Sequence, residues 1–331
     1  MKTYEEFSHF CAGKLNADLE LMQTERSAVV RRLLILRLIL GLMILGILGI
    51  MFLAEMLTES IEENTFLLVI SVLIAISYLM IMIFIFMKQK KVRADFVIKF
   101  KNKIISSIVK FFDVSLSYYP EKFIPLNEFA SSGLIDRRIE RYYGDDYVEG
   151  KIGQTAFRFS EVHAFVEEGS DDKKRYVEVF GGIFFIGDFN KNFKGRTYVL
   201  PDKIEKTFGR FAKFFQSLSK SRGQLVKLED IEFEKEFAVY SDDQIEARYI
   251  LSTSLMQRIL EFKRKAGSDI MMAFKESCIY MAIPIKGNLF EPKIFGKLVS
   301  EDTLRKYYAD LNIAISSIED LNLNLRIWSK E

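Results

Sequence analysis

His163 and Glu161 are the residues of this 331-residue chain whose types and spacing best fit a catalytic pair. They stand two positions apart in TAFRFSEVHAFVEE, whose alternation predicts a strand, so both side chains project from one face. A carboxylate beside an imidazole can act as a general base. Neighbours on one strand face more often form a packed or surface pair, however, so we predict no catalytic residue here.

A run of carboxylates after position 228 could supply oxygen ligands to a divalent cation. Its members are Glu229, Asp230, Glu232, Glu234 and Glu236, followed by Asp242 and Asp243. The run lacks the glycine and the ligand spacing of a calcium-binding EF-hand loop. Its alternation with apolar residues is typical of a strand with one solvated face. We therefore predict no metal site and keep Asp230, Glu232 and Glu234 as candidate contacts for a partner.

A polar turn with two aromatic residues follows the second predicted strand. Its candidate partner-binding residues are Asp188, Phe189, Asn190, Lys191 and Phe193. These residues could bind a partner or only form the turn of a hairpin, and we favour the hairpin turn. Gly182 and Gly187 have the spacing of a phosphate-binding loop, but Asp188 and Phe189 stand where that loop needs Lys and then Ser or Thr.

Other cofactor classes are disfavoured by composition. Cys11 and Cys278 lie far apart without other Cys or His at metal-binding spacing, so we expect neither a zinc site nor a disulfide framework. We predict no cofactor. The balance of 47 basic against 45 acidic residues, a net charge of +2, argues against a nucleic-acid partner.

Two apolar segments, 33–54 and 66–87, are long enough to cross a bilayer. The first includes an unbroken apolar run from Leu38 to Ala54, and the second has no charged residue. At 1.5 Å per residue, the second covers about 33 Å, against a hydrocarbon core of roughly 30 Å. We predict a transmembrane hairpin over 33–87 with an acidic outer loop at 55–65.

The charges that flank the spans predict the orientation of the hairpin. Basic residues precede the first span and follow the second, at Arg26, Arg31, Arg32, Arg37, Lys88, Lys90, Lys91 and Arg93. The loop at 55–65 carries four glutamates and neither Lys nor Arg. By the positive-inside rule, both termini lie in the cytoplasm.

The segments on either side of the hairpin are predicted to be amphipathic helices. Residues 1–32 carry an apolar stripe that we expect to pack on the cytoplasmic domain or on another copy, with the bilayer surface as the alternative. Residues 88–119 form a basic juxtamembrane helix. Its candidate membrane-surface residues are Lys88, Lys90, Lys91, Arg93, Lys99, Lys101 and Lys103. We expect these residues to bind anionic phospholipid, although basic flanking for topology alone would give the same pattern.

Residues 120–331 are predicted to form a cytoplasmic α+β domain with a mainly antiparallel sheet, because strand candidates cluster in hairpins. We expect helices over Leu126–Tyr143, Ile204–Ser219, Thr253–Ala266 and from Ser300 onward. The end signals of the third are Ser254 and Gln257 at capping-box spacing and Gly267 beyond its last turn. We expect strands in TAFRFSEVHAFVEE, RYVEVFGGIFFIGDF, Thr197–Leu200, QLVKLEDIEFEKEFAVYS, Ala247–Leu251, Ile270–Phe274 and Cys278–Ile285.

Several stretches of this domain resemble a family of bacterial membrane proteins of unknown function, some of whose genes lie near those of LemA-type proteins. The resemblance rests on YGDDYVEG at 143–150, FSE at 159–161, GIFF at 182–185, DFNK at 188–191, LED at 228–230, FEK at 233–235, VYSDDQ at 239–244 and EARY at 246–249. It covers roughly Ile139–Pro292. The resemblance implies two spans followed by a cytoplasmic domain, and it implies no activity or catalytic residue.

These observations favour a non-enzymatic module anchored in a bacterial inner membrane. We expect it to associate with itself or to organise another membrane protein. The alternative is a membrane-proximal enzyme that uses a divalent metal, held by carboxylates such as Asp230 and Glu232, on a lipid or nucleotide. A transport subunit is disfavoured, because the spans carry no charge beyond Arg37.

Overall fold

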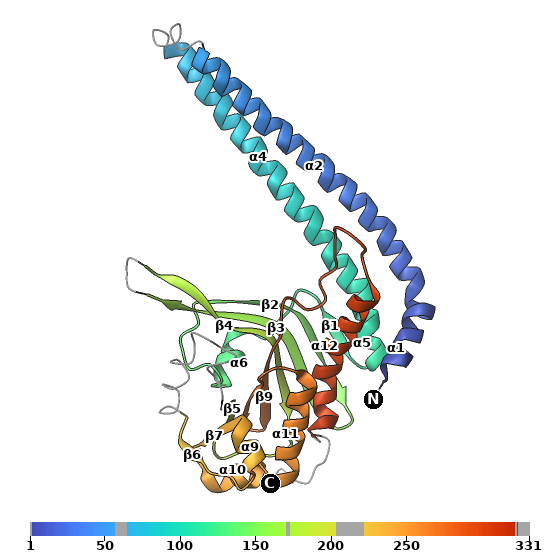
Figure 1. Cartoon of the computed structure of the whole chain (residues 1–331), viewed down its shortest axis with the longest axis vertical. Helices are drawn as coiled ribbons and strands as arrows, with labels where there is room; N and C mark the ends of the chain where they lie inside the picture. The colour runs from blue at the N-terminus through green and yellow to red at the C-terminus, as the bar shows by residue number, and fades with distance from the viewer. Residues whose placement is uncertain (1, 57–64, 170–172, 203–221, 322, 324–331) are drawn as a thin grey trace. The chain divides into compact units, whose positions relative to one another are not determined.

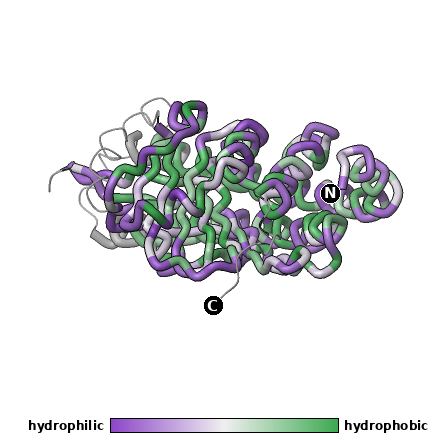
Figure 2. Tube along the Cα trace, turned by 90° about the horizontal axis from the view of Figure 1, so that it is seen from below, coloured by the Kyte–Doolittle hydropathy of each residue, from purple (hydrophilic) through white to green (hydrophobic). Residues whose placement is uncertain are grey.

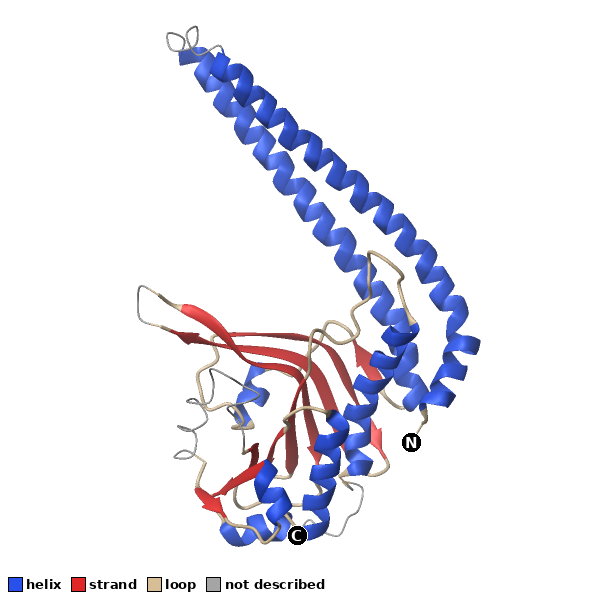
Figure 3. Ribbon diagram, in the orientation of Figure 1, coloured by secondary structure: helices blue, strands red, loops and turns tan. Residues whose placement is uncertain are grey.

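The computed structural model describes the chain except residues 1, 57–64, 170–172, 203–221, 322 and 324–331. The chain forms two compact units, whose helices and strands are drawn in Figures 1 and 3. We call them the sheet unit, made of Met1–Cys11, Ile105–Glu291 and Glu301–Glu331, and the hairpin unit, made of Ala12–Ile104 and Pro292–Ser300.

Two long helices build the hairpin unit, α2 (Asn16–Met56) and α4 (Thr65–Phe100). Each contains a stretch long and apolar enough to cross a membrane. Where side-chain burial is described, most large apolar side chains of these stretches are exposed, with Leu45 at 64% and Phe84 at 63%. The core helix of a soluble protein would bury such side chains. The exposed surface therefore agrees with the predicted pair of spans.

The helices α2 and α4 run antiparallel in a fixed register. Lys99 Nζ lies 2.6 Å from Glu25 Oε1. Farther along the pair, a Cβ added at Gly46 would lie 2.7 Å from the Tyr78 hydroxyl oxygen. In an antiparallel pair, residues at the same height have numbers with a constant sum. Both contacts give a sum of 124, so Arg37 of α2 lies level with Met87 of α4. The basic residues that flank the two spans therefore lie at the same end of the pair.

The N-terminal segment begins with a capped helix. In α1 (Tyr4–Phe10), the Thr3 hydroxyl accepts the N–H of Glu6, whose carboxylate accepts the N–H of Thr3. Within the sheet unit, the Phe7 ring packs 5.5 Å from Phe111 and 5.2 Å from Tyr308. These contacts agree with the prediction that the apolar stripe packs on the domain. A π-helical turn (Cys11–Leu15) follows and leads into α2.

The basic segment after the second span is helical but not uniformly exposed. The helix α4 is followed by a π-helical turn (Lys101–Ile105) and α5 (Ser106–Phe112). Lys101 is only 2% exposed, and it must be removed from the predicted lipid-facing residues. The reason is that a π turn holds more residues than an α turn, so side chains rotate away from the face that α periodicity assigns them. Lys103 pairs with Asp18 of α2 at 3.1 Å.

The described residues of the sheet unit form a nine-stranded antiparallel sheet, in the order β1-β2-β3-β4-β9-β8-β5-β7-β6. The strands are β1 (Ser117–Tyr119), β2 (Arg141–Ile152), β3 (Thr155–Glu168), β4 (Arg175–Asp188), β5 (Thr197–Pro201), β6 (Gln224–Val226), β7 (Phe237–Ser241), β8 (Met271–Lys275) and β9 (Cys278–Pro284). The predicted hairpins β3–β4 and β8–β9 are both present. This confirms an α+β domain with an antiparallel sheet.

Besides α1 and α5, the described part of the sheet unit contains the helices α6 (Leu126–Ser131), α9 (Ile231–Glu236), α10 (Gln244–Ile250), α11 (Thr253–Ala266) and α12 (Glu301–Asp320). The predictions of α11 and α12 are confirmed. The N-cap of α11 is Ser252, whose hydroxyl accepts the N–H of Leu255, rather than the predicted Ser254. Gly267 ends α11 with a left-handed φ of 63°, as its sequence position suggested.

Three predicted elements are wrong in whole or in part. The helix expected over Leu126–Tyr143 ends at Ser131, and strand β2 begins at Arg141. The strands expected around 229–236 and 247–251 are the helices α9 and α10. Asp230 and Asp243 cap their first turns, and a helix cap outweighs the short alternating pattern. The predicted helix Ile204–Ser219 lies outside the described residues.

The core of the sheet unit is largely aromatic. Phe129 on α6 packs 4.7 Å, ring centre to ring centre, from Phe184 on β4. Ala164, Met271 and other buried residues of β3, β4, β8 and β9 complete the cluster. Figure 2 shows apolar segments inside this unit and hydrophilic segments at its periphery. This core fixes the strands that carry the polar groups described next.

Candidate functional site

Glu161 and His163 lie on one face of β3, as the alternation predicts. His163 Nε2 is 2.8 Å from Glu161 Oε1, and its Nδ1 is 2.6 Å from Glu178 Oε1 on β4. Gly181, opposite His163, makes room for this pair, because a Cβ there would lie 2.6 Å from the Glu178 carboxylate. The Tyr143 ring of β2 stacks on the imidazole at 5.0 Å.

Both ring nitrogens of His163 therefore contact carboxylates. The hydrogen bond to Glu161, opposed by burial and supported by Glu178, raises the pKa of His163 to about 9. The ring is an imidazolium at neutral pH and donates both protons to neighbouring acids. A cation in this state cannot accept a proton as a general base. The geometry thus agrees with the packed pair that we favoured.

Glu161 also belongs to a group of three carboxylates. Asp145, Asp146 and Glu161 each place one oxygen within 4.8 Å of the others. Asp146 is fully buried at a bulge in β2, with a left-handed φ of 56°, and accepts the hydroxyl proton of Tyr118. Carboxylate oxygens are ligands for hard divalent cations. Glu161 Oε2 also accepts the N–H of Leu289 at 2.7 Å, so this carboxylate has a structural role as well.

Sequence reasoning missed this group because its members come from different strands. Asp145 and Asp146 stand in β2, and only the sheet register places Asp145 opposite Glu161. The local signal was an adjacent pair of acids that follows a glycine and is flanked by tyrosines, in the sequence YYGDDY of β2.

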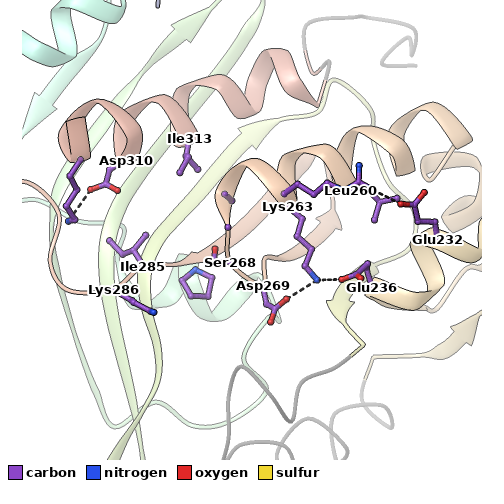
Figure 4. Close-up of a pocket in the computed structure, with 15 residues that line it drawn as sticks. Glu232, Glu236, Leu260, Lys263, Ser268, Asp269, Ile285, Lys286, Asp310 and Ile313 are labelled. Atoms are coloured by element: carbon purple, nitrogen blue, oxygen red, sulfur yellow. Dashed lines mark hydrogen bonds and ion pairs between the residues drawn. The ribbon is translucent and has the colours of Figure 1, made fainter. Parts of the chain in front are cut away.

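A cleft of about 980 Å³ forms a second candidate site in the sheet unit, shown in Figure 4. It lies where α11 ends, beside α12 and the residues that follow β9. Lys263 Nζ lies 2.7 Å from Glu236 and 2.9 Å from Asp269. Arg264 pairs with Glu232 at 2.5 Å. Most charges that line the cleft are thus balanced by a neighbour.

Two buried atoms in this cleft lack a hydrogen bond, Ser268 Oγ and Asp310 Oδ2. The Asp310 oxygen is 3.2 Å from Lys306 Nζ, an ion-pair distance without hydrogen-bond geometry. Burial raises the pKa of Asp310, and Lys306 opposes that effect. Lys286 is exposed at the rim and pairs with no acid among the described residues. A small polar ligand would find an acceptor, a hydroxyl and a cation here.

The structure packs the aromatic part of the predicted partner-binding turn inward. Phe189 and Phe193 are both 8% exposed, and their rings lie 5.3 and 6.0 Å from that of Phe274. Lys191 Nζ lies 4.0 Å from the ring centre of Tyr249, and burial lowers the pKa of this lysine. The rings of Phe189 and Phe193 are thus part of the core of the sheet unit and do not form a docking surface.

The start of the same turn is stabilised locally. Asp188 Oδ1 accepts the N–H of Asn190 at 2.9 Å, and Asn190 adopts a left-handed φ of 56°. Asparagine tolerates this conformation better than most residues. The turn therefore has the structural features expected of a hairpin closure.

The predicted acidic contacts also have partners within the chain. Asp230 caps α9 and accepts a hydrogen bond from Gln257 at 2.9 Å. Glu234 accepts a backbone N–H six residues earlier at 2.8 Å. Glu232 pairs with Arg264 at the cleft. The structure thus does not bring these acids together as a cation site.

The predicted membrane-surface residues divide into two groups. Lys88, Lys90, Lys91 and Arg93 are exposed on α4 next to the second span. Lys99 and Lys103 pair with acids of α2, and Lys101 is buried. The part of the basic segment closest to the span thus holds the available charge.

Comparison with known proteins supports the resemblance to a family of unknown function. Residues 178–323, a little under half of the chain, match the family model described as a protein of unknown function (DUF3137). The match includes the resembling stretches from 182 to 249, whereas those before residue 178 lie outside it. No curated protein matches the chain.

One solved structure is similar, the mycobacterial trehalose monomycolate transport factor A, TtfA. It shares 11% sequence identity, with a TM-score of 0.37, over 68% of this chain and 94% of that chain. A similarity of this size carries no inference about function.

Proposed function

We propose that this protein is a membrane-anchored interaction module of a bacterial inner membrane. In this proposal, α2 and α4 cross the bilayer and both termini lie in the cytoplasm. The sheet unit is held at that face, where it associates with further copies or organises another membrane protein.

The exposed apolar surface of the paired helices carries this proposal. From Leu38 to Ala54, α2 offers about 25 Å of apolar length at 1.5 Å per residue, close to a hydrocarbon core of roughly 30 Å. Because Arg37 lies level with Met87, the apolar parts of both helices end at the same depth. Basic residues flank this end, and the connecting segment has acids without Lys or Arg. This asymmetry supports the proposed orientation.

The alternative of a divalent-metal-dependent enzyme is weaker. It relied on Asp230 and Glu232, which serve as a helix cap and as the partner of Arg264. Both carboxylates therefore make structural contacts and are not gathered as ligands around one position.

The mass of the intact assembly tests the organising role. The full chain, tagged and purified from gently solubilised bacterial membranes, should carry either further copies of the 38.5 kDa chain or a second membrane protein in a fixed ratio. The measurement is made at a protein concentration that matches the one in the membrane. Recovery of a single chain with only lipid and detergent would contradict the proposal.

A further inference from the structure

The segment Pro292–Ser300 joins β9 to α12 in sequence but packs within the hairpin unit. Ile294 and Leu298 are buried at 4% and 2% exposure and hold the segment in place. Between them, Phe295 is 43% exposed. Gly296, with a φ of 103°, allows the chain to turn directly after it. The segment thus presents an aromatic ring at the tip of a fixed turn.

Two arginines of α2 set the position of this tip along the hairpin. Arg26 Nη1 donates to the Ile294 carbonyl at 3.1 Å, and the Arg37 guanidinium lies 4.5 Å from the ring centre of Phe295. Arg37 is the last charge before the apolar run and lies level with Met87. Helical side chains tilt toward the N-terminus, so Arg37 reaches back from the apolar region. Phe295 therefore lies at the boundary between the apolar and charged parts of the hairpin.

The tip also carries unbalanced positive charge. Lys293 and Lys297 are exposed on either side of Phe295, and neither forms an ion pair with a described residue. An aromatic ring between lysines fits the boundary between anionic headgroups and acyl chains. Each lysine near such a surface raises the binding constant for the surface about fivefold when screening by salt is weak.

We propose that Pro292–Ser300 is a lipid-binding tip. Phe295 enters the headgroup–acyl boundary, and Lys293 and Lys297 contact the phosphates of anionic phospholipids. The proposal rests on insertion of the hairpin, and it adds a lipid contact from a segment about 200 residues beyond the spans in sequence.

Tryptophan fluorescence of the full chain in vesicles tests the depth of this tip. The single tryptophan, Trp328, is replaced by Phe, and one new tryptophan is introduced in each variant. Phe295→Trp reports on the tip, Leu45→Trp on the span, and Ile245→Trp on an exposed site of the sheet unit. Vesicles contain anionic phosphatidylglycerol, with bromine placed on the acyl chains either near the headgroup or near the methyl end.

We expect the Phe295→Trp emission to shift to shorter wavelength and to lose intensity with bromine near the headgroup. Changing Lys293 and Lys297 to Gln should reduce this loss, and so should exchanging phosphatidylglycerol for phosphatidylcholine. Quenching at Leu45→Trp without quenching at Phe295→Trp would overturn the lipid-binding tip while leaving the spans in place. Absence of quenching at both would overturn the proposed function too. Equal quenching at Ile245→Trp and Phe295→Trp would also refute a specific tip.

Discussion

The charged state of His163 leads to a specific prediction about pH. His163 sits between Glu161 and Glu178, and its pKa is raised from 6.5 to about 9. A raised pKa means that the contribution to stability is complete below pH 6.5 and is lost as pH rises through about 9. The shift corresponds to about 3 kcal/mol at 1.36 kcal/mol per unit. Because the Glu178 side chain is 46% exposed, solvent screening should reduce this to about 1.5 kcal/mol.

The variant His163→Gln should lose this pH-dependent contribution. Thermal unfolding of the full chain in detergent, followed by near-ultraviolet circular dichroism between pH 6 and 9.5, would measure it. At pH 6 the variant should unfold about 4 °C below the parent chain. The difference should shrink as pH rises, because deprotonation of the parent removes the same charge.

The other histidine provides the matched control. His9 is exposed on α1, so His9→Gln should follow the parent curve at every pH. Comparison of the two variants separates the effect of His163 from that of cysteines and lysines that titrate at high pH. A difference between His163→Gln and the parent that stays constant from pH 6 to 9.5 would refute the proposed charge state.

Three further substitutions test the packing of the sheet unit by denaturant unfolding. Gly182→Ala should destabilise the sheet unit by about 2 kcal/mol or more, because a Cβ at this φ of 153° would lie 2.3 Å from the Ile283 carbonyl oxygen on β9. An unchanged unfolding midpoint would contradict the β4–β9 register. Arg222→Met should cost about 1–3 kcal/mol, because one buried and one partly buried carbonyl after α6 would lose their donor, and a neutral result would refute that role. Phe184→Ala should cost about 3–5 kcal/mol by opening a cavity beside α6, and a loss below 1 kcal/mol would contradict the central place of this ring.

Features that depend on neighbouring residues were readable from the sequence. Apolar length and flanking charge predicted the helices α2 and α4, and alternation predicted the hairpin β3–β4. The helix α11 was predicted from its end signals. Short elements were harder, since the alternating acids around 232 form a helix once Asp230 caps its first turn.

The candidate sites depend on contacts that sequence spacing does not encode. Glu178 reaches His163 only through the β3–β4 register, and Asp145 reaches Glu161 only through that of β2 and β3. The burial of Lys101 follows from a π turn that α periodicity cannot predict. Long-range strand pairing therefore determines which polar side chains meet, whereas local sequence patterns predict the longer helices and strands.

Thiol labelling of intact cells tests most directly whether α2 and α4 form a transmembrane hairpin with a cytoplasmic sheet unit. In a chain with Cys11 and Cys278 replaced by Ser, single cysteines are introduced as Glu59→Cys between the spans and Lys286→Cys at the rim of the cleft. A membrane-impermeant maleimide should label position 59 in intact cells and position 286 only after the inner membrane is opened. Labelling of position 286 in intact cells, or recovery of the chain in the soluble fraction, would contradict the account.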